Sequence, residues 1–236
     1  MPVEAFNKFE SREELAEALS DKFAELLDLD FSSGSFASIA LSGGSTPKGV
    51  LDRLGPKLGA NKQMVYFALV DERYVSPDDD RSNERMIRHH LDLQDHPDSE
   101  FLSLYSDDHD AAEDAAQVAE EKLLEDEELP FDVVSLGMGT DGHTASFFPG
   151  GDNLEAATSR TTDRLFISML APGAQEPRIT MTLPCLTSAR NLFLHIEGEE
   201  KLKVYEEALK DGPADDLPIR HVLRHPDVNL QVYWAP

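Results

Sequence analysis

The stretch Val133-Val134-Ser135-Leu136-Gly137-Met138-Gly139-Thr140-Asp141-Gly142-His143-Thr144-Ala145-Ser146-Phe147-Phe148-Pro149 decides how the rest of the chain is interpreted. An apolar run that favours a β-strand leads directly into a loop that holds glycines, an aspartate and a histidine. In α/β proteins, loops at the carboxyl ends of strands are the usual place for a ligand. The stretch therefore predicts a strand that ends at the edge of an active site.

The same glycines, Gly137, Gly139 and Gly142, also fit the G-x-G-x-x-G pattern of dinucleotide-binding folds. That pattern requires a long helix directly after the turn and an acidic residue at the end of the next strand. Here residues 149–151 are Pro-Gly-Gly, which would end a helix early, and the next apolar run at 165–170 is followed by no acid. These departures argue against a nucleotide site.

Outward from this loop, apolar runs alternate with amphipathic ones along most of the chain. We expect strands at 36–41, 65–70, 131–136, 165–170, 179–183, 191–196 and 230–234, and helices at 12–28, 47–54, 82–91, 111–128 and 199–209. Parallel strands need crossover connections, which helices supply. The pattern predicts an α/β fold with a mainly parallel, doubly wound, Rossmann-like sheet, helices on both faces and room for a small antiparallel extension.

Length and composition favour one catalytic domain over residues 1–236, because 40% hydrophobic residues suffice for a sizeable core. The N-terminus does not resemble a signal peptide and no apolar run is long enough to span a membrane, so a cytoplasmic protein is expected. The single cysteine, Cys185, cannot form an internal disulfide. It lies in an apolar segment and is expected to pack in the core.

The formal charge of −25 argues against nucleic acid or an anionic membrane as partner. Such an excess of acid favours solubility and resembles the surfaces of salt-adapted proteins. If the substrate carries a phosphate, the few cations must gather in its pocket against this field.

Two further polar clusters follow predicted strands. In Ser42-Gly43-Gly44-Ser45-Thr46-Pro47, backbone N–H groups and a helix N-terminus could bind an anion, although an ordinary tight turn explains the segment equally well. Asp71-Glu72-Arg73 ends the next strand. Its arginine could bind a phosphate or carboxylate, or could simply pair with Glu72 or Asp78.

His143 is the only histidine in a glycine loop at a predicted strand end. With Asp141 beside it, the imidazole is suited to take up a proton near neutral pH. A metal site has little support, because no second histidine or cysteine lies at ligand spacing. The chain also has no serine nucleophile elbow and no C-x-x-C motif.

Taken together, five motifs resemble the 6-phosphogluconolactonase family in their order and spacing: 42–47, 71–73 with Ser82-Asn83, 137–149, 178–180 and 198–201. Glucosamine-6-phosphate deaminases belong to the same superfamily. There, the resemblance implies an asparagine and a glutamate before the proline and an Asp-Glu-Tyr motif, whereas this chain has Phe147-Phe148 and Arg73. Because ring opening and proton shuttling need an additional acid or base, the lactonase is favoured over the deaminase.

The resemblance implies hydrolysis of 6-phospho-D-glucono-1,5-lactone to 6-phospho-D-gluconate in the oxidative pentose phosphate pathway. It assigns His143 as the base that activates water and Asp141 as a residue that shapes the loop or orients the imidazole or the sugar hydroxyls. Substrate contacts are implied for Gly43, Gly44, Ser45, Thr46, Asp71, Arg73, Arg178 and Lys201, with Arg73 and Lys201 on the phosphate. No cofactor or metal is needed, and the partner is the small phosphorylated lactone, bound by a monomer or homodimer.

Two alternatives stay open at this point. Lys201 lies on a glutamate-rich helix, where ion pairs between residues four positions apart are the ordinary explanation for a lysine. A non-catalytic sensor of phosphorylated sugars would keep the phosphate contacts, but it would have no need of His143.

Overall fold

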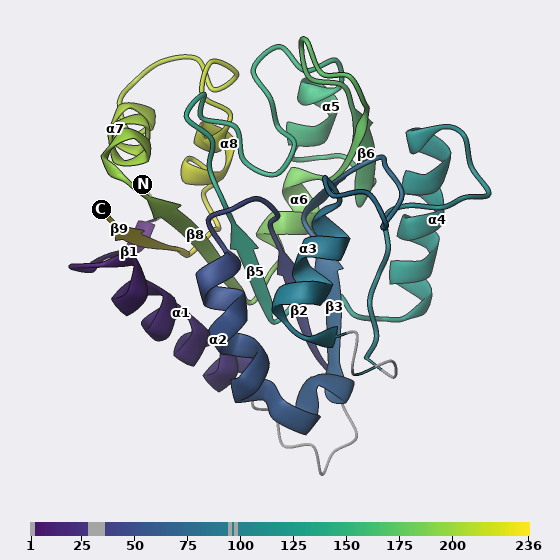
Figure 1. The fold of residues 1–236 in the computed structure, drawn as a ribbon. Coiled ribbons are helices and arrows are strands. Elements are labelled where there is room, and N and C mark those ends of the chain that lie inside the picture. Colours follow the sequence, from purple (N-terminus) through teal and green to yellow (C-terminus); the bar gives the residue numbers. More distant parts are fainter. Residues whose placement is uncertain (1–2, 28–35, 94–95, 97–98) are drawn as a thin grey trace.

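The computed structural model describes residues 3–27, 36–93, 96 and 99–236. Its main sheet is parallel throughout, and its strands pair in the order β1-β9-β8-β5-β2-β3 (Figure 1). Their bounds are β1 (Val3–Lys8), β9 (Leu230–Ala235), β8 (Asn191–Glu197), β5 (Val133–Leu136), β2 (Ala37–Leu41) and β3 (Val65–Leu69).

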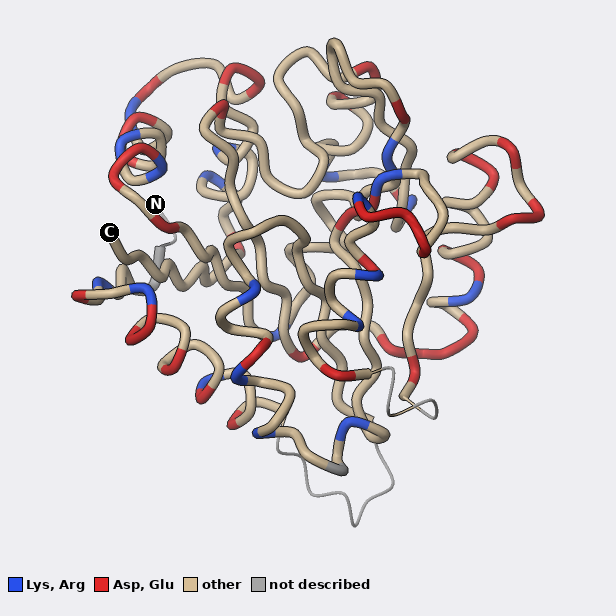
Figure 2. Tube along the Cα trace, viewed as in Figure 1, with Lys and Arg blue, Asp and Glu red and all other residues tan. Residues whose placement is uncertain are grey.

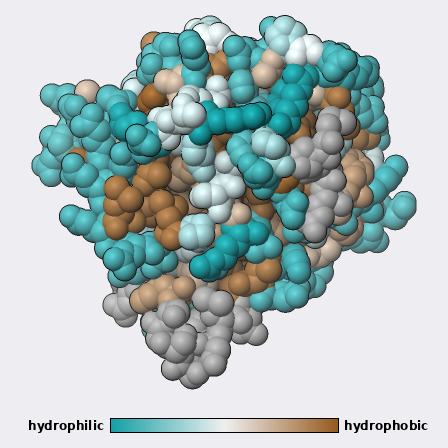
Figure 3. All heavy atoms as spheres, turned by 180° about the vertical axis from the view of Figure 1, so that it is seen from behind, coloured by the Kyte–Doolittle hydropathy of each residue, from teal (hydrophilic) through white to brown (hydrophobic). Residues whose placement is uncertain are grey.

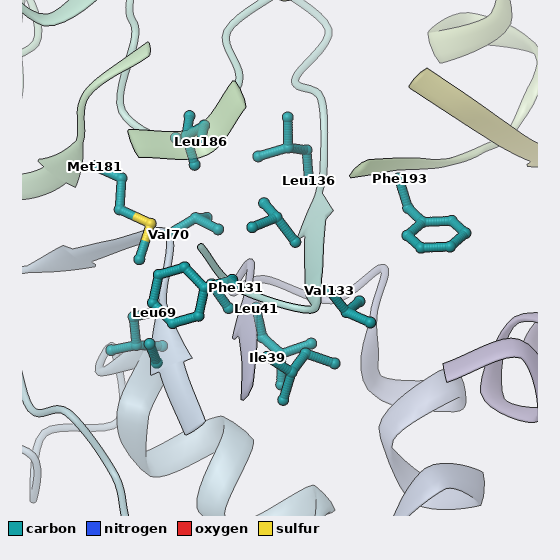
Figure 4. Close-up of a cluster of buried hydrophobic side chains, with 14 of the residues drawn as sticks. Ile39, Leu41, Leu69, Val70, Phe131, Val133, Leu136, Met181, Leu186 and Phe193 are labelled. Atoms are coloured by element: carbon teal, nitrogen blue, oxygen red, sulfur yellow. The ribbon is translucent and has the colours of Figure 1, made fainter. Parts of the chain in front are cut away.

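The three strands β5, β2 and β3 are buried along their whole length. Continuous apolar runs of this kind are typical of parallel strands that are covered on both faces. Ile39, Leu69 and Val133 extend from them into a cluster that also receives Phe131 and Met181 (Figure 4). These side chains belong to the main hydrophobic core.

Helices cover both faces of the sheet. On one face, α1 (Arg12–Leu27) packs beside α2 (Lys48–Leu58), and its Phe23 contacts Phe193 of β8 edge to face. On the other face, Tyr205 of α7 (Glu199–Ala208) stacks on Phe6 of β1. The predicted doubly wound sheet is therefore confirmed.

The direction of winding reverses between β2 and β5, which are hydrogen-bonded neighbours. After β2 the chain moves to β3 at one edge, whereas after β5 it moves through β8 and β9 toward the other edge. Loops that leave two adjacent parallel strands in opposite directions open a crevice between them. The fold itself thus places a binding site after Leu41 and Leu136.

A second, antiparallel sheet has the order β4 (Asp71–Arg73), β7 (Arg178–Met181) and β6 (Phe166–Met169). One residue, Val70, separates β3 from this sheet, which is covered by α4 (Ala112–Glu125). This sheet is the small antiparallel extension that the sequence pattern allowed. The remaining elements are a 3-10 helix (Gly59–Met64), α3 (Asn83–His90), α5 (Leu154–Thr158), α6 (Leu183–Thr187) and α8 (Ile219–Leu223).

Several sequence-based boundaries differ from the structure, among them the predicted helix 111–128, which ends at Glu125, and the predicted strand 131–136, which starts at Val133. The helix predicted to stop at Leu54 continues through Pro56 to Leu58, because Leu58 is buried in the core. The strand predicted over 179–183 ends at Met181. Residues 183–187 form α6 instead, with Pro184 in the first turn, where a helix tolerates proline. This helix carries the buried Cys185. Residue 28, the predicted end of the first helix, lies outside the described residues.

Acidic residues are spread over the outer helices and loops (Figure 2). The face seen from behind is mainly hydrophilic, with hydrophobic areas between the polar residues (Figure 3). In the described part of the chain, no helix has the length and apolar character needed to cross a membrane.

Candidate active site

A cavity of about 280 Å³ opens at the carboxyl ends of β2, β5 and β8, where the winding reverses. Its lining combines backbone amides, hydroxyls and basic side chains. A larger hollow of about 370 Å³ lies between β1 and α7, but its lining is mostly apolar. Because chemistry needs convergent polar groups, the smaller cavity is the candidate active site.

His143 and Asp141 form a hydrogen-bonded pair at this cavity. Asp141 Oδ1 lies 2.6 Å from His143 Nδ1 and also accepts a hydrogen bond from the His143 backbone N–H at 3.1 Å. The hydrogen bond from His143 holds the pKa of the Asp141 carboxyl below its ordinary value. Since a carboxylate can only accept, Nδ1 carries the proton and Nε2 keeps a lone pair in the neutral imidazole. The imidazole is thus prepared to act as a base through Nε2.

The loop around this pair is compact because of its glycines. Gly139 N donates to His143 O at 2.9 Å, and Gly142 N donates to Gly139 O at 3.1 Å. A Cβ on Gly139 would lie 2.2 Å from His143 Nδ1, so no larger residue fits beside the ring. Gly142 has a φ of +76°, a left-handed conformation that glycine adopts without strain. The ring of Phe148 packs on His143, with ring centroids 4.6 Å apart.

The loop after β2 offers free amides to the cavity. Ser42 ties it to the neighbouring loop, since its Oγ donates to Ser135 O and accepts from Gly137 N, both at 2.9 Å. Across 43–46, the backbone N–H groups donate to no described residue. Gly44 has a φ of +89°, and a Cβ on Gly43 would lie 1.9 Å from Asn83 Oδ1. This segment, followed by the N-terminus of α2, has the properties of an anion site.

Lys201 turns away from the glutamates of its own helix. Its Nζ donates to Thr46 Oγ1 at 3.0 Å and makes no ion pair with a described carboxylate. Burial lowers the pKa of Lys201. Pairing within the helix, the ordinary explanation for this lysine, is therefore wrong. A half-buried ammonium without an acidic partner indicates a place for an anion.

Arg73 and Arg178 lie directly opposite each other on the antiparallel strands β4 and β7. Like charges in that position destabilise a sheet. Arg73 pairs with neither Glu72 nor Asp78 through its guanidinium, which donates to Arg81 O at 2.7 Å and Asn83 Oδ1 at 3.2 Å. A bound dianion would offset the repulsion between the two guanidinium groups.

Asp71 forms an ion pair with Arg178. It is buried, and its Oδ2 accepts from Ser146 Oγ at 2.6 Å and from Arg178 Nη1 at 3.4 Å. Arg178 also lies over the ring of Phe148, at 5.0 Å from its centroid. Much of the hydrogen-bonding capacity of Asp71 is thus used to hold Ser146 and Arg178 in place.

Glu72 is a buried acid that links β4 to α3 next to the cavity. Its carboxylate accepts from Ser82 Oγ and from the backbone N–H groups of Arg73, Asn83 and Glu84, which fixes β4 to the start of α3. Burial raises the pKa of Glu72 to about 7 in spite of these four hydrogen bonds. Through this contact Asn83 reaches the cavity wall.

The structure brings nearly all the sequence-predicted site residues together. The cavity is lined by Gly43, Gly44, Ser45, Thr46, Asp71, Arg73, His143, Arg178 and Lys201, and Asp141 lies beside His143. Asn83 and His195 also line it, although neither was among the predicted contacts. The signal for His195 was its place at the carboxyl end of a predicted strand. Over the described residues, no group of His, Cys, Asp and Glu side chains is arranged to hold a metal ion.

Comparison with known proteins agrees with this geometry. A family model described as glucosamine-6-phosphate isomerases/6-phosphogluconolactonase matches residues 10–234. A 6-phosphogluconolactonase of Rhizobium meliloti is 44% identical over 228 residues, covering 97% of each chain. One from Mesorhizobium japonicum is 37% identical over 233 residues, covering 98% of this chain and 95% of the relative. The crystal structure of a 6-phosphogluconolactonase from Shewanella baltica matches with a TM-score of 0.89 at 37% identity, over 98% of this chain and 97% of that one.

Proposed function

Because the chain belongs to the glucosamine-6-phosphate isomerase/6-phosphogluconolactonase family, we propose that it hydrolyses 6-phospho-D-glucono-1,5-lactone to 6-phospho-D-gluconate. One observation carries the proposal: the His143–Asp141 pair, at 2.6 Å, shares a cavity with Lys201 and Arg73, which have no acidic partner among the described side chains. A base and an anion site in one cavity suit a phosphorylated ester.

His143 Nε2 takes a proton from a water molecule while the water oxygen attacks the lactone carbonyl carbon. The tetrahedral intermediate then collapses, the bond from that carbon to the ring oxygen breaks, and the imidazolium returns the proton to the ring oxygen. Asp141 stabilises the imidazolium between these steps by keeping its hydrogen bond to Nδ1. The new carboxylic acid ionises, so one proton is released at neutral pH for each lactone opened.

The phosphate of the substrate is held by Lys201 and Arg73, and Arg178 adds a further contact. Free amides of the 43–46 segment and the hydroxyls of Ser45 and Thr46 complete this anion site. Amides that face the developing oxyanion instead would each contribute about 3 kcal/mol to its stabilisation. The reaction then requires no group beyond water and these side chains.

Phe148 argues against a deaminase. Its ring packs on His143 at the place where proton shuttling between sugar carbons would need a second acid or base. We further expect the protein to act in the oxidative pentose phosphate pathway of the cytoplasm, as a monomer or a homodimer.

The test is base uptake in a pH-stat with fresh 6-phosphogluconolactone, with and without the purified protein, and release of ammonia from glucosamine 6-phosphate. The proposal predicts lactone opening well above the spontaneous rate and no ammonia. Uptake equal to that of buffer alone, or ammonia release, would contradict it. Stable binding of 6-phosphogluconate without turnover would instead indicate a sensor.

A further inference from the structure

His195 is a buried histidine to which the mechanism gives no role. It lies at the carboxyl end of β8, is 3% exposed and lines the cavity together with Lys201. In the register of the sheet it pairs with Tyr233 of β9. A buried polar side chain costs free energy unless each of its polar atoms has a partner. Each of the two ring nitrogens of His195 therefore needs a hydrogen-bond partner.

Glu197 fixes one of the two nitrogens. His195 Nε2 lies 3.1 Å from Glu197 Oε1, and Arg12 Nε lies 3.5 Å from the other carboxylate oxygen. A carboxylate paired with an arginine only accepts hydrogen bonds, so Nε2 must carry the proton. The tautomer of the neutral ring is thereby set, and Nδ1 is left as an acceptor.

Nδ1 has no hydrogen-bond partner among the described residues. It is also not one of the solvent-excluded side-chain atoms that lack a partner, so the cavity reaches it. Lys201, Arg73 and the free amides of 43–46 line this cavity and can only donate hydrogen bonds. A ligand that brings hydroxyl groups into the cavity can donate to Asp71 and to His143 Nε2, and His195 Nδ1 is the acceptor that β8 adds to them.

We propose that His195 is a substrate-binding residue that accepts, at Nδ1, a hydrogen bond from a sugar hydroxyl near the phosphate-bearing carbon. This inference rests on the proposed function and extends it to the sugar. Glu197 is the positioning residue that holds the ring. The strand β8 leads through Glu197 directly into α7, which carries Lys201, so His195 lies on the side of the cavity that holds the phosphate. The pair makes the site prefer a phosphorylated polyol over a bare phosphate.

Two variants separate the two nitrogens. In His195→Gln the side-chain amide reaches toward Glu197 and leaves the position of Nδ1 empty, whereas in His195→Asn the amide oxygen takes that position. We expect the dissociation constant of 6-phosphogluconate, measured by titration calorimetry, to rise about tenfold in His195→Gln and less than about threefold in His195→Asn, as for loss of one hydrogen bond. The constant for inorganic phosphate should stay unchanged in both.

The dissociation constant of inorganic phosphate separates substrate binding from a merely structural role. If His195→Gln distorted the cavity, it would weaken the binding of both 6-phosphogluconate and phosphate. Equal weakening of 6-phosphogluconate and phosphate in His195→Gln would overturn the inference, and so would unchanged binding of both. Wild-type protein that neither binds 6-phosphogluconate nor opens the lactone would refute the proposed function as well. Wild-type protein that does both, with His195→Gln equal to it, would refute only the role of His195.

Discussion

His143 can occupy its place in the cavity only because residue 139 has no side chain. A Cβ on Gly139 would approach His143 Nδ1 to 2.2 Å and Asp141 Oδ1 to 2.6 Å. Both atoms belong to side chains that can rotate away, so we expect the fold to survive a substitution that breaks the hydrogen bond between His143 and Asp141. Activity and stability should therefore separate at this position.

Gly139→Ala is expected to lower kcat by about 100-fold, the size of a lost general base, with little change in the free energy of unfolding. Gly49→Ala is the matched control. Gly49 lies in α2, and a Cβ on it would contact Ala16 of α1 at an ordinary distance of 3.6 Å. Steady-state kinetics and urea unfolding of both variants check the prediction. Equal kcat values for the two variants would contradict it.

Lys201 and Lys203 lie on the same helix with different surroundings. Lys201 is half-buried and contacts Thr46, whereas Lys203 is exposed. We expect Lys201→Met to raise KM for the phosphorylated lactone by about tenfold to 100-fold, as for a lost charge-assisted hydrogen bond, and Lys203→Met to leave KM unchanged.

The same kinetics with unphosphorylated glucono-1,5-lactone provide the control for Lys201. If this residue binds the phosphate, the Met variant and the wild type should not differ on that substrate. A penalty that is equal for both lactones would show that Lys201 acts elsewhere in the site.

Among single residues, the sequence predicted which side chains could do chemistry better than it predicted which side chains contact each other. The glycines, His143 and Asp141 are neighbours in the chain, so their proximity could be inferred from spacing alone. Whether Lys201 faced the glutamates of its helix or the cavity could not, because that depends on how α7 is set against the loop at Thr46. His195 was missed because a histidine in an apolar strand is most often a core residue, and its only signal was its place at the carboxyl end of that strand.

Among the elements, β4 and α3 are joined by the buried carboxylate of Glu72. Its pKa of about 7 lies above the ordinary value of 4.5, so the folded state binds the proton more tightly than the unfolded state. The stability contributed by Glu72 is therefore complete below pH 4.5 and is lost as the pH rises through about 7.

This linkage predicts how Glu72→Gln changes the pH dependence of stability. Between pH 4.5 and pH 8, the wild type should lose about 3 kcal/mol more of its free energy of unfolding than the variant does. Urea unfolding at several pH values checks this, because effects of all other acids cancel in the comparison. Parallel curves for the two proteins would contradict the raised pKa of Glu72.

The small antiparallel sheet shows the limit of prediction from periodicity. The runs that became β6 and β7 were expected as strands, but nothing in their pattern indicated that β7 pairs with β4 rather than with the main sheet. That pairing is what sets Arg178 opposite Arg73. The strand β1 was missed because its sequence, VEAFNK, carries charged and polar residues that suit an edge of the sheet.

Two features of the whole molecule determine where the site lies and how salt affects stability: the reversal of winding and the net charge. Alternation of strands and helices predicted the doubly wound sheet, and the reversal between β2 and β5 explains why distant motifs meet. The net charge of −25 makes the surface repel anions, whereas the cavity is lined by cations. Repulsion among surface acids opposes the compact state and is screened by salt.

The free energy of unfolding should therefore rise with KCl, and most of the rise should come below about 0.3 M, where the Debye length shortens most steeply. Urea unfolding at a series of KCl concentrations measures it. Sucrose, which is excluded from protein surfaces without screening charge, serves as the control. A gain that grows linearly with salt, or none, would show that charge repulsion is not what limits stability.

The most direct test of the account is the hydrolysis of 6-phosphogluconolactone by the wild type and by His143→Ala, with 6-phosphogluconate binding measured on both. The account predicts a kcat lower by about 100-fold or more in the variant, with the affinity for 6-phosphogluconate kept within about threefold. A variant that binds 6-phosphogluconate and opens the lactone as fast as the wild type would contradict the assignment of His143 as the base.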